Sequence, residues 1–174
     1  MLSKGKVYES FAEIIECNKG DSNLSLATFK PTEIVDFLIE KDEREWDPDK
    51  LQAILARAKQ DDFFRDNSKC FEVVKKLPYK FRYAFKDDTG QTRKLMINDW
   101  EIGALYWKEL KRKGGNEEET LKSVRKKYLH QLVDNRDIHL FVGTNQKFDL
   151  KNAPNPFMII GVFYPPIVLQ NELF

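Results

Sequence analysis

The stretch from Tyr79 to Trp107 constrains the fold more than any other part of the chain. Residues 79–86 (YKFRYAFK) alternate aromatic side chains with basic or small ones, which is the period-two pattern of a strand with one apolar face. Residues 92–97 have the pattern of a second strand, and the DDTG segment between the two is rich in turn-forming residues. This arrangement predicts a β-hairpin.

The register of the hairpin follows from its turn. A loop made of residues 88–90 places glycine at the position that favours a left-handed backbone after a type I turn. A slip of one residue would move every side chain to the opposite face of the sheet. The register that keeps apolar residues together pairs Tyr83 with Leu95 and Phe81 with Ile97.

A helix is predicted to start directly after the hairpin, with Asn98 as its N-cap and Glu101 completing a capping box. Its apolar residues include three aromatic side chains and cover more than one stripe, so we expect the helix to be buried on two sides. Gly114 and Gly115 are expected to end it.

The first third of the chain carries weaker signals. Residues 6–17 have mixed alternation and predict a strand, with residues 24–29 as its partner in a second hairpin. Pro31 suits the first position of a helix that runs to about Glu40. A further helix is expected after Asp47, which can serve as N-cap while Pro48 takes the first helical position.

The middle of the chain is less regular. Residues 61–69 predict a connecting loop, and the short apolar segment 70–77 fits either a helix or a strand. Asn116 is expected to cap a second long helix whose first turn is rich in glutamate. We expect four residues of this helix to face the core: Leu121, Val124, Tyr128 and Leu132.

Two strands are predicted near the C-terminus, at residues 137–144 and 157–163. The second contains MIIGVF, which is apolar at every position except one glycine, and such strands are buried on both faces and central in a sheet. Pro165 and Pro166 should end this strand. The apolar tail, residues 167–174, is expected to pack.

These elements predict an α+β protein. We expect an antiparallel or mixed sheet of about six strands, built from hairpins, with about four helices packed on it. A length of 174 residues suits one compact domain, residues 1–174.

Composition limits the class of protein. Hydrophobic content of 41% argues against disorder, and no apolar segment is long enough to span a bilayer. A signal-peptide segment is not evident, and Cys17 and Cys70 lack the spacing of a disulfide framework or a zinc site. We therefore expect a cytoplasmic protein with no bound cofactor and no membrane association.

Charge is distributed unevenly although the net charge is only +1. Residues 1–50 carry 12 acidic and 7 basic side chains, whereas residues 51–174 carry 16 acidic and 22 basic ones. Such asymmetry is typical of a partner surface, and it also occurs on ordinary solvated surfaces.

One set of residues fits a catalytic site. Asp137 lies at the start of a predicted strand, and Asp149 and Lys151 form an Asp-x-Lys triplet that resembles the triplet of restriction-type nucleases. In such a site carboxylates hold Mg²⁺ and the lysine stabilises developing charge. An Asp-x-Lys triplet can also occur by chance, and these residues then belong to an ordinary surface loop.

A basic face is the second candidate site. The hairpin register places Lys80, Arg82 and Lys94 opposite the apolar face, and the last long helix adds Lys122, Arg125 and Lys126. These residues could contact a phosphate backbone without any exposed aromatic side chain.

The leading functional expectation is a non-catalytic binding or regulatory module that acts through a protein partner, because the sequence shows charge asymmetry, many aromatic residues and no complete catalytic motif. The alternatives are a nucleic-acid-binding accessory protein and a Mg²⁺-dependent nuclease that uses the triplet above.

Overall fold

The structure is a computed structural model, which describes residues 6–20, 22–62, 75–145 and 153–167. The chain divides into a larger compact unit, residues 1–39 and 81–174, and a smaller one, residues 40–80. The single domain expected for residues 1–174 stays a prediction.

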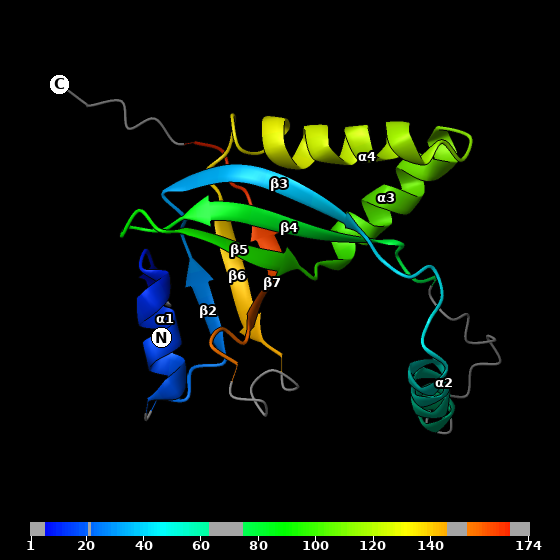
Figure 1. The fold of residues 1–174 in the computed structure, drawn as a ribbon, viewed down its shortest axis with the longest axis horizontal. Coiled ribbons are helices and arrows are strands. Elements are labelled where there is room, and N and C mark those ends of the chain that lie inside the picture. Colours follow the sequence, from blue (N-terminus) through cyan, green and yellow to red (C-terminus); the bar gives the residue numbers. More distant parts are fainter. Residues whose placement is uncertain (1–5, 21, 63–74, 146–152, 168–174) are drawn as a thin grey trace. The chain divides into compact units, whose positions relative to one another are not determined.

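The described residues form an α+β fold, as predicted (Figure 1). Seven strands build one mixed sheet in the order β1-β2-β6-β7-β5-β4-β3, against an expected number of about six. The strands are β1 (Val7–Tyr8), β2 (Leu26–Phe29), β3 (Glu33–Lys41), β4 (Tyr79–Lys86), β5 (Thr92–Ile97), β6 (His139–Thr144) and β7 (Phe157–Phe163).

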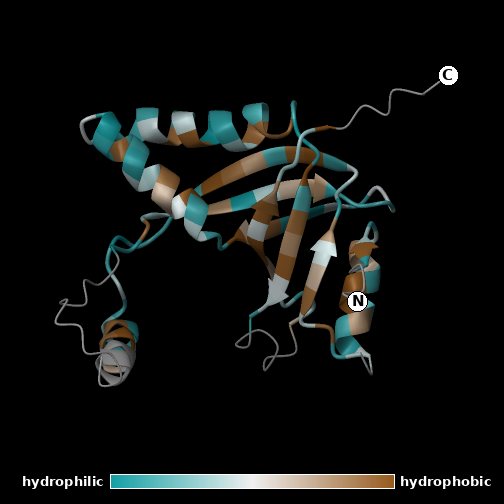
Figure 2. Ribbon diagram, turned by 180° about the vertical axis from the view of Figure 1, so that it is seen from behind, coloured by the Kyte–Doolittle hydropathy of each residue, from teal (hydrophilic) through white to brown (hydrophobic). Residues whose placement is uncertain are grey.

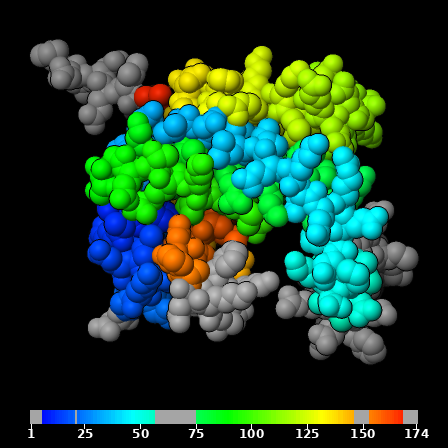
Figure 3. All heavy atoms as spheres, in the orientation of Figure 1, coloured from blue at the N-terminus to red at the C-terminus, as the bar shows by residue number. Residues whose placement is uncertain are grey.

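Four α-helices and one π-helical segment complete this part of the chain. They are α1 (Phe11–Lys19), α2 (Pro48–Asp62), α3 (Trp100–Arg112), α4 (Glu117–Arg125) and the π-helical η1 (Lys126–Gln131). Helix α4 lies along β3 (Figures 1 and 3). None of the helices in the described ranges has the length and apolar content that a membrane span requires.

The sheet is strongly curled around an aromatic core. The rings of Phe29 on β2 and Phe85 on β4 have centroids 5.2 Å apart, although three strands separate β2 from β4 in the sheet. Phe11 of α1 meets both rings edge-on, at 5.3 and 5.8 Å, and also meets Phe157 of β7. Helix α1 therefore closes one side of the core through edge-to-face aromatic contacts.

A second aromatic cluster joins β3, β4 and η1. Phe37 stacks on Phe81 and on Tyr128, each with ring centroids 5.6 Å apart. The buried hydroxyl of Tyr83 donates a 2.7 Å hydrogen bond to the main-chain carbonyl of Tyr128. This contact ties the helical layer to the inner face of the sheet.

The central hairpin has the predicted register. Tyr83 pairs with Leu95 and Phe81 with Ile97. The amide of Gly90 donates to the carbonyl of Asp87 at 3.0 Å, and Gly90 has a φ of 74°, as the three-residue loop requires.

The prediction of a strand over residues 6–17 is wrong. Within this range only β1 is a strand. It pairs in parallel with β2, so the expected second hairpin does not form. Ser10 caps α1 by accepting from the amide of Glu13, and Phe11 and Ile14 are buried one turn apart. The cap and the apolar spacing outweigh the weak alternation.

The helix expected from Pro31 to Glu40 is also wrong, because this segment is β3. Phe37 is buried against β4 and η1, and the segment contains the β-branched residues Ile34, Val35 and Ile39. Pairing within the sheet overrides the helix-start signal of Pro31.

The other helix predictions are mostly confirmed. Helix α2 begins at Pro48 with Asp47 accepting from the amides of residues 49 and 50, and Asn116 caps α4. The N-cap of α3 is Asp99 rather than Asn98, and α3 is buried on one face only, since Trp100 is 79% exposed. Most of the predicted loop 61–69 and the segment 70–77, and nearly all of the tail 167–174, lie outside the described residues.

Both C-terminal strands form, with β7 at the centre of the sheet as predicted. It pairs antiparallel with β6 and in parallel with β5. The prediction that this strand is buried on both faces holds at Met158, which lies opposite Gly143, but is wrong further along, where Ile160 and Phe163 are exposed. The reason is that helix α1 and the α4–η1 segment pack on the inner face, so that no described helix of the larger unit covers the outer face of β7 (Figure 2).

Candidate functional site

The outer face of strands β2, β6 and β7 exposes four large apolar side chains, which we call the open face: Leu26, Phe141, Ile160 and Phe163. Their exposed fractions are 63%, 41%, 42% and 51%. Figure 2 looks onto these strands and shows no helix of the larger unit in front of them. Exposure of several neighbouring large apolar residues on a stable sheet is typical of a binding surface.

Strand alternation produces this surface. In β6, Leu140 and Val142 are fully buried on the inner face, so Phe141 between them must point outward. The β6–β7 register places Phe141 opposite Gly161, and His139 opposite Phe163. These four residues therefore share the outer face of the sheet.

Two glycines let the apolar side chains meet across the strands. A Cβ placed on Gly143 would lie 3.1 Å from Cδ2 of Leu26 and 3.2 Å from Cδ1 of Ile160, so both side chains lie over this glycine. Phe141 covers Gly161 in the same way. The rings of Phe141 and Phe163 have centroids 6.1 Å apart. The open face is consequently continuous rather than a set of scattered apolar residues.

A hollow of about 380 Å³ extends the open face towards the sheet edge. Its lining includes Leu26, Phe141 and Ile160 together with Tyr8 and Lys6. The ammonium group of Lys6 lies 4.5 Å from the centroid of the Tyr8 ring and pairs with Glu13. The hollow can hold an apolar side chain beside a positive charge.

Trp100 follows a residue that contacts β7 directly. Its predecessor Asp99 accepts a hydrogen bond from the main-chain amide of Val162 at 3.3 Å and caps α3 through the amide of Glu101 at 2.9 Å. The buried carboxylate of Asp99 therefore fixes the start of α3 beside the end of β7. The strongly exposed Trp100 begins the helix at that point.

Polar residues mark one end of the open face. The Nζ atom of Lys30 lies 2.9 Å from Oδ1 of Asp137, and Nε2 of His139 lies 3.1 Å from Oδ2 of the same carboxylate. His139 also contacts the ring of Phe163, with centroids 6.2 Å apart. The hydrogen bond from Lys30 lowers the pKa of Asp137 against the opposing effect of burial, and the bond to His139 lowers it further.

The predicted catalytic residues are placed only in part. Asp137 is the carboxylate just described, held by Lys30 and His139. Asp149 and Lys151 lie outside the described residues, so the proposed nuclease triplet stays a prediction. Over the ranges that the structure covers, no three histidine, cysteine or acidic side chains are grouped so as to hold a metal ion.

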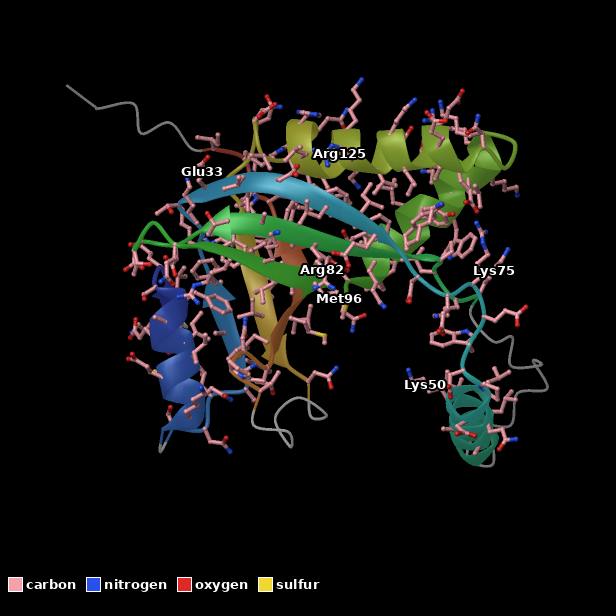
Figure 4. All side chains as sticks on the ribbon, in the orientation of Figure 1. Glu33, Lys50, Lys75, Arg82, Met96 and Arg125 are labelled. Atoms are coloured by element: carbon pink, nitrogen blue, oxygen red, sulfur yellow. The ribbon has the colours of Figure 1, made fainter. Side chains whose placement is uncertain are left out.

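The six predicted nucleic-acid-binding residues fall into separate groups. Lys80 pairs with Asp42 at 2.8 Å. Arg82 and Lys94 lie on the outer face of β4 and β5, where Arg82 is paired with Met96 across the strands (Figure 4).

The helical group consists of Lys122, Arg125 and Lys126. Lys122 pairs with Glu118 at 2.6 Å, and Arg125 pairs with Asp36 at 2.6 Å. Carboxylates thus already neutralise two of these three cations, while Lys126 is exposed at the start of η1. Whether these residues bind nucleic acid stays a prediction.

Sequence reasoning missed the open face. A signal was present in β6, where His139, Phe141 and Gly143 alternate with the purely apolar Leu140 and Val142. For β7, the unbroken apolar run hid the alternation, because nothing in MIIGVF distinguishes an inward from an outward side chain.

Comparison of the chain with curated proteins and with solved structures gives no match in either set. One family model does match, over residues 7–174. That span covers nearly the whole chain, so the protein belongs to the family described as Domain of unknown function (DUF8757).

Proposed function

We propose that this protein is a non-catalytic binding module that holds a protein partner on its open face. The observation that carries the proposal is the continuous exposure of Leu26, Phe141, Ile160 and Phe163 on three adjacent strands. Burial of apolar surface stabilises a complex by roughly 25 cal/mol for each Å² removed from water. These side chains therefore supply a driving force for association.

The composition of the surface favours a protein partner. Protein interfaces combine an apolar centre that is poor in charge with a polar rim. Here the centre contains two phenylalanines and two aliphatic residues, and the charged residues Lys6 and Lys30 lie at its borders. Large apolar anchors of this kind contribute most of the binding energy in many protein complexes.

The surface is also pre-organised. Phe141 and Ile160 project from paired strands near the centre of the sheet rather than from loops. Binding on such strands needs little ordering of the chain, and a small ordering cost leaves more of the contact energy as affinity.

Site-specific photo-crosslinking tests the proposal. A benzophenone amino acid replaces Phe163 in the full chain, expressed in the cells that naturally make the protein, and the adducts are identified by mass spectrometry. The matched control carries the same group at Val35, which is 42% exposed but lies on β3 at the edge of the sheet. We expect a discrete protein adduct from position 163 that is lost when Leu26→Asp is added.

Two results would count against the proposal. One is the absence of any protein adduct from position 163. The other is the same set of adducts from positions 163 and 35, which would indicate nonspecific contact with an apolar side chain.

A nucleic-acid-binding role is the alternative proposal. The exposed side chain of Lys126 on the α4–η1 surface favours it, whereas Lys122, one turn away, is exposed but pairs with Glu118. Fluorescence anisotropy with labelled single- and double-stranded oligonucleotides at two salt concentrations tests this role. Salt-sensitive binding that weakens in Lys126→Gln would support it, since each phosphate contact contributes to the salt dependence. Binding unchanged by this substitution would exclude the basic surface.

A further inference from the structure

The outer apolar surface continues beyond the open face to the edge of the sheet. Val7 on β1 pairs with Thr28 on β2, and Thr28 pairs with Phe141 on β6. Paired residues point to the same side of a sheet, so Val7 lies on the outer face beside the open face. Val7 is 44% exposed. Exposed apolar side chains therefore lie on four adjacent strands: β1, β2, β6 and β7.

The charges beside this surface pair with one another. At one end, the ammonium group of Lys30 binds the carboxylate of Asp137, which also contacts His139. Near the hollow that borders the open face, Lys6 pairs with Glu13. With a neutral histidine these charges sum to zero. The surface thus offers no net charge that would select a basic or an acidic partner, and two such surfaces would not repel each other.

We infer that the open face packs against the open face of a second copy of this chain, in a two-fold symmetric dimer whose axis passes beside Lys30 and Asp137. This inference rests on the proposed function, because it names the protein partner that the open face holds. In a two-fold dimer the same surface is buried on both copies, so the surface must be complementary to itself. Lys30 and Asp137 meet this condition, because the lysine of each copy can bind the carboxylate of the other.

The exposed area agrees with what such a dimer needs. With about 200 Å² for the full area of a large side chain, Val7 and the four residues of the open face together expose about 500 Å². A standard interface buries about 800 Å² on each partner, and in homodimers about 65% of that area is apolar, or about 520 Å². The five residues therefore supply nearly the whole apolar part of a standard homodimer interface.

Sedimentation velocity of the full chain tests the inference. We expect wild type to dimerise, and we expect Phe141→Asp and Leu26→Asp each to weaken dimerisation about 100-fold, because a two-fold dimer loses each contact twice at about tenfold per contact. Val35→Asp, at an exposed residue of β3, is the matched control and should leave the dimer unchanged. Two variants are used so that one poorly folded chain cannot decide the outcome, and circular dichroism checks the fold of each.

Exchange of the two border charges tests the symmetry of the dimer. A chain that carries both Lys30→Asp and Asp137→Lys keeps an ion pair within each copy and across a dimer of two exchanged chains. In a mixed dimer with wild type, like charges would face each other across the axis. Energy transfer between fluorescently labelled chains measures the affinities. We expect the exchanged chain to bind itself as wild type does, and to bind wild type about tenfold more weakly or worse.

Four results would overturn the inference. Wild type that stays monomeric up to about 100 µM, where even weak dimers form, would do so. A dimer that both Phe141→Asp and Leu26→Asp leave intact would form through another surface. Equal affinity of the exchanged chain for itself and for wild type would remove the two-fold axis beside Lys30 and Asp137. The fourth result is a crosslink from position 163 to a second copy that maps outside the strands of the open face.

Failure of the inference and failure of the proposed function are distinguishable. A monomeric chain that still forms an adduct with a different protein from position 163 would overturn the inference and leave the proposed function standing. A monomeric chain that forms no protein adduct from that position would overturn both.

Discussion

The guanidinium of Arg125 on α4 donates to the main-chain carbonyl of Phe37 on β3. The same guanidinium lies 2.6 Å from the carboxylate of Asp36, which in turn accepts from the amide of Phe37 at 2.8 Å. Strand β3 is at the edge of the sheet, where unpaired main-chain groups favour pairing with other chains. Arg125 and Asp36 together satisfy both main-chain groups of Phe37.

Arg125→Met should therefore destabilise the fold and promote self-association. The contact is partly exposed, so we expect a loss of about 1 kcal/mol in the free energy of unfolding. Urea denaturation measures the loss, and light scattering measures the association. Lys126→Met is the matched control on the neighbouring, exposed position, and equal effects of the two substitutions would argue against edge protection.

Tyr83→Phe should destabilise the fold although it removes a single oxygen atom. The Tyr83 hydroxyl is the donor to the buried carbonyl of Tyr128, and loss of a buried donor costs about 1–3 kcal/mol. If Tyr83→Phe unfolds at the same urea concentration as wild type, this bond does not stabilise the helical layer.

Alkaline pH should destabilise wild type through the same residue. Burial raises the pKa of Tyr83, and the neighbouring Tyr128 adds to the effect. The unfolded chain releases this proton near the ordinary tyrosine pKa of about 10, so the free energy of unfolding falls as pH rises above that value. Ultraviolet absorbance should show tyrosine ionisation that coincides with unfolding, and Tyr83→Phe should show a shallower loss of stability.

Asp87→Asn should weaken the hairpin in a pH-dependent manner. Burial raises the pKa of Asp87, but hydrogen bonds from Thr89 and Arg93 outweigh burial and hold the pKa below 3.8. The Arg93 Nε lies 2.8 Å from Oδ2 of Asp87. Because the folded-state pKa is lowered, this stabilisation is complete above about pH 4 and is lost as pH falls through the folded-state value.

Urea denaturation between pH 2 and 7 measures the effect. At pH 7 we expect Asp87→Asn to lose about 2 kcal/mol, the size of a hydrogen bond to a charged group. The difference from wild type should shrink below about pH 4. A difference that stays constant over the whole range would show that packing, rather than the ionised carboxylate, is what the substitution disturbs.

Phe163→Asp should affect the free energy of unfolding far less than a buried substitution does. Phe163 is half exposed, and its ring contacts in the described chain are tilted contacts with Phe141 and His139, so we expect a loss of about 1 kcal/mol or less. Ile159→Asp, at a fully buried position of the same strand, should instead prevent folding. Thermal unfolding of both variants is the measurement, and equal effects would contradict the assignment of Phe163 to an open surface.

Some local features of this protein followed from its sequence, whereas the Ser10-capped helix α1 and the N-cap of α3 at Asp99 did not. The register of the β4–β5 hairpin was predictable because the turn residues and the apolar alternation agree on one pairing. The caps at Asp47 and Asn116 were predictable because a cap depends on the few residues next to it. The α+β class followed from the sum of such local patterns.

Tertiary structure determined the features that depend on contacts between residues far apart in the sequence. Residues 33–41 form a strand rather than a helix because Phe37 packs against β4 and η1, and no local pattern encodes that contact. The open face likewise depends on which side of β6 and β7 the helices cover. Apolar character alone tells whether a side chain prefers burial, whereas the packing of remote elements determines whether Phe141 and Ile160 obtain it.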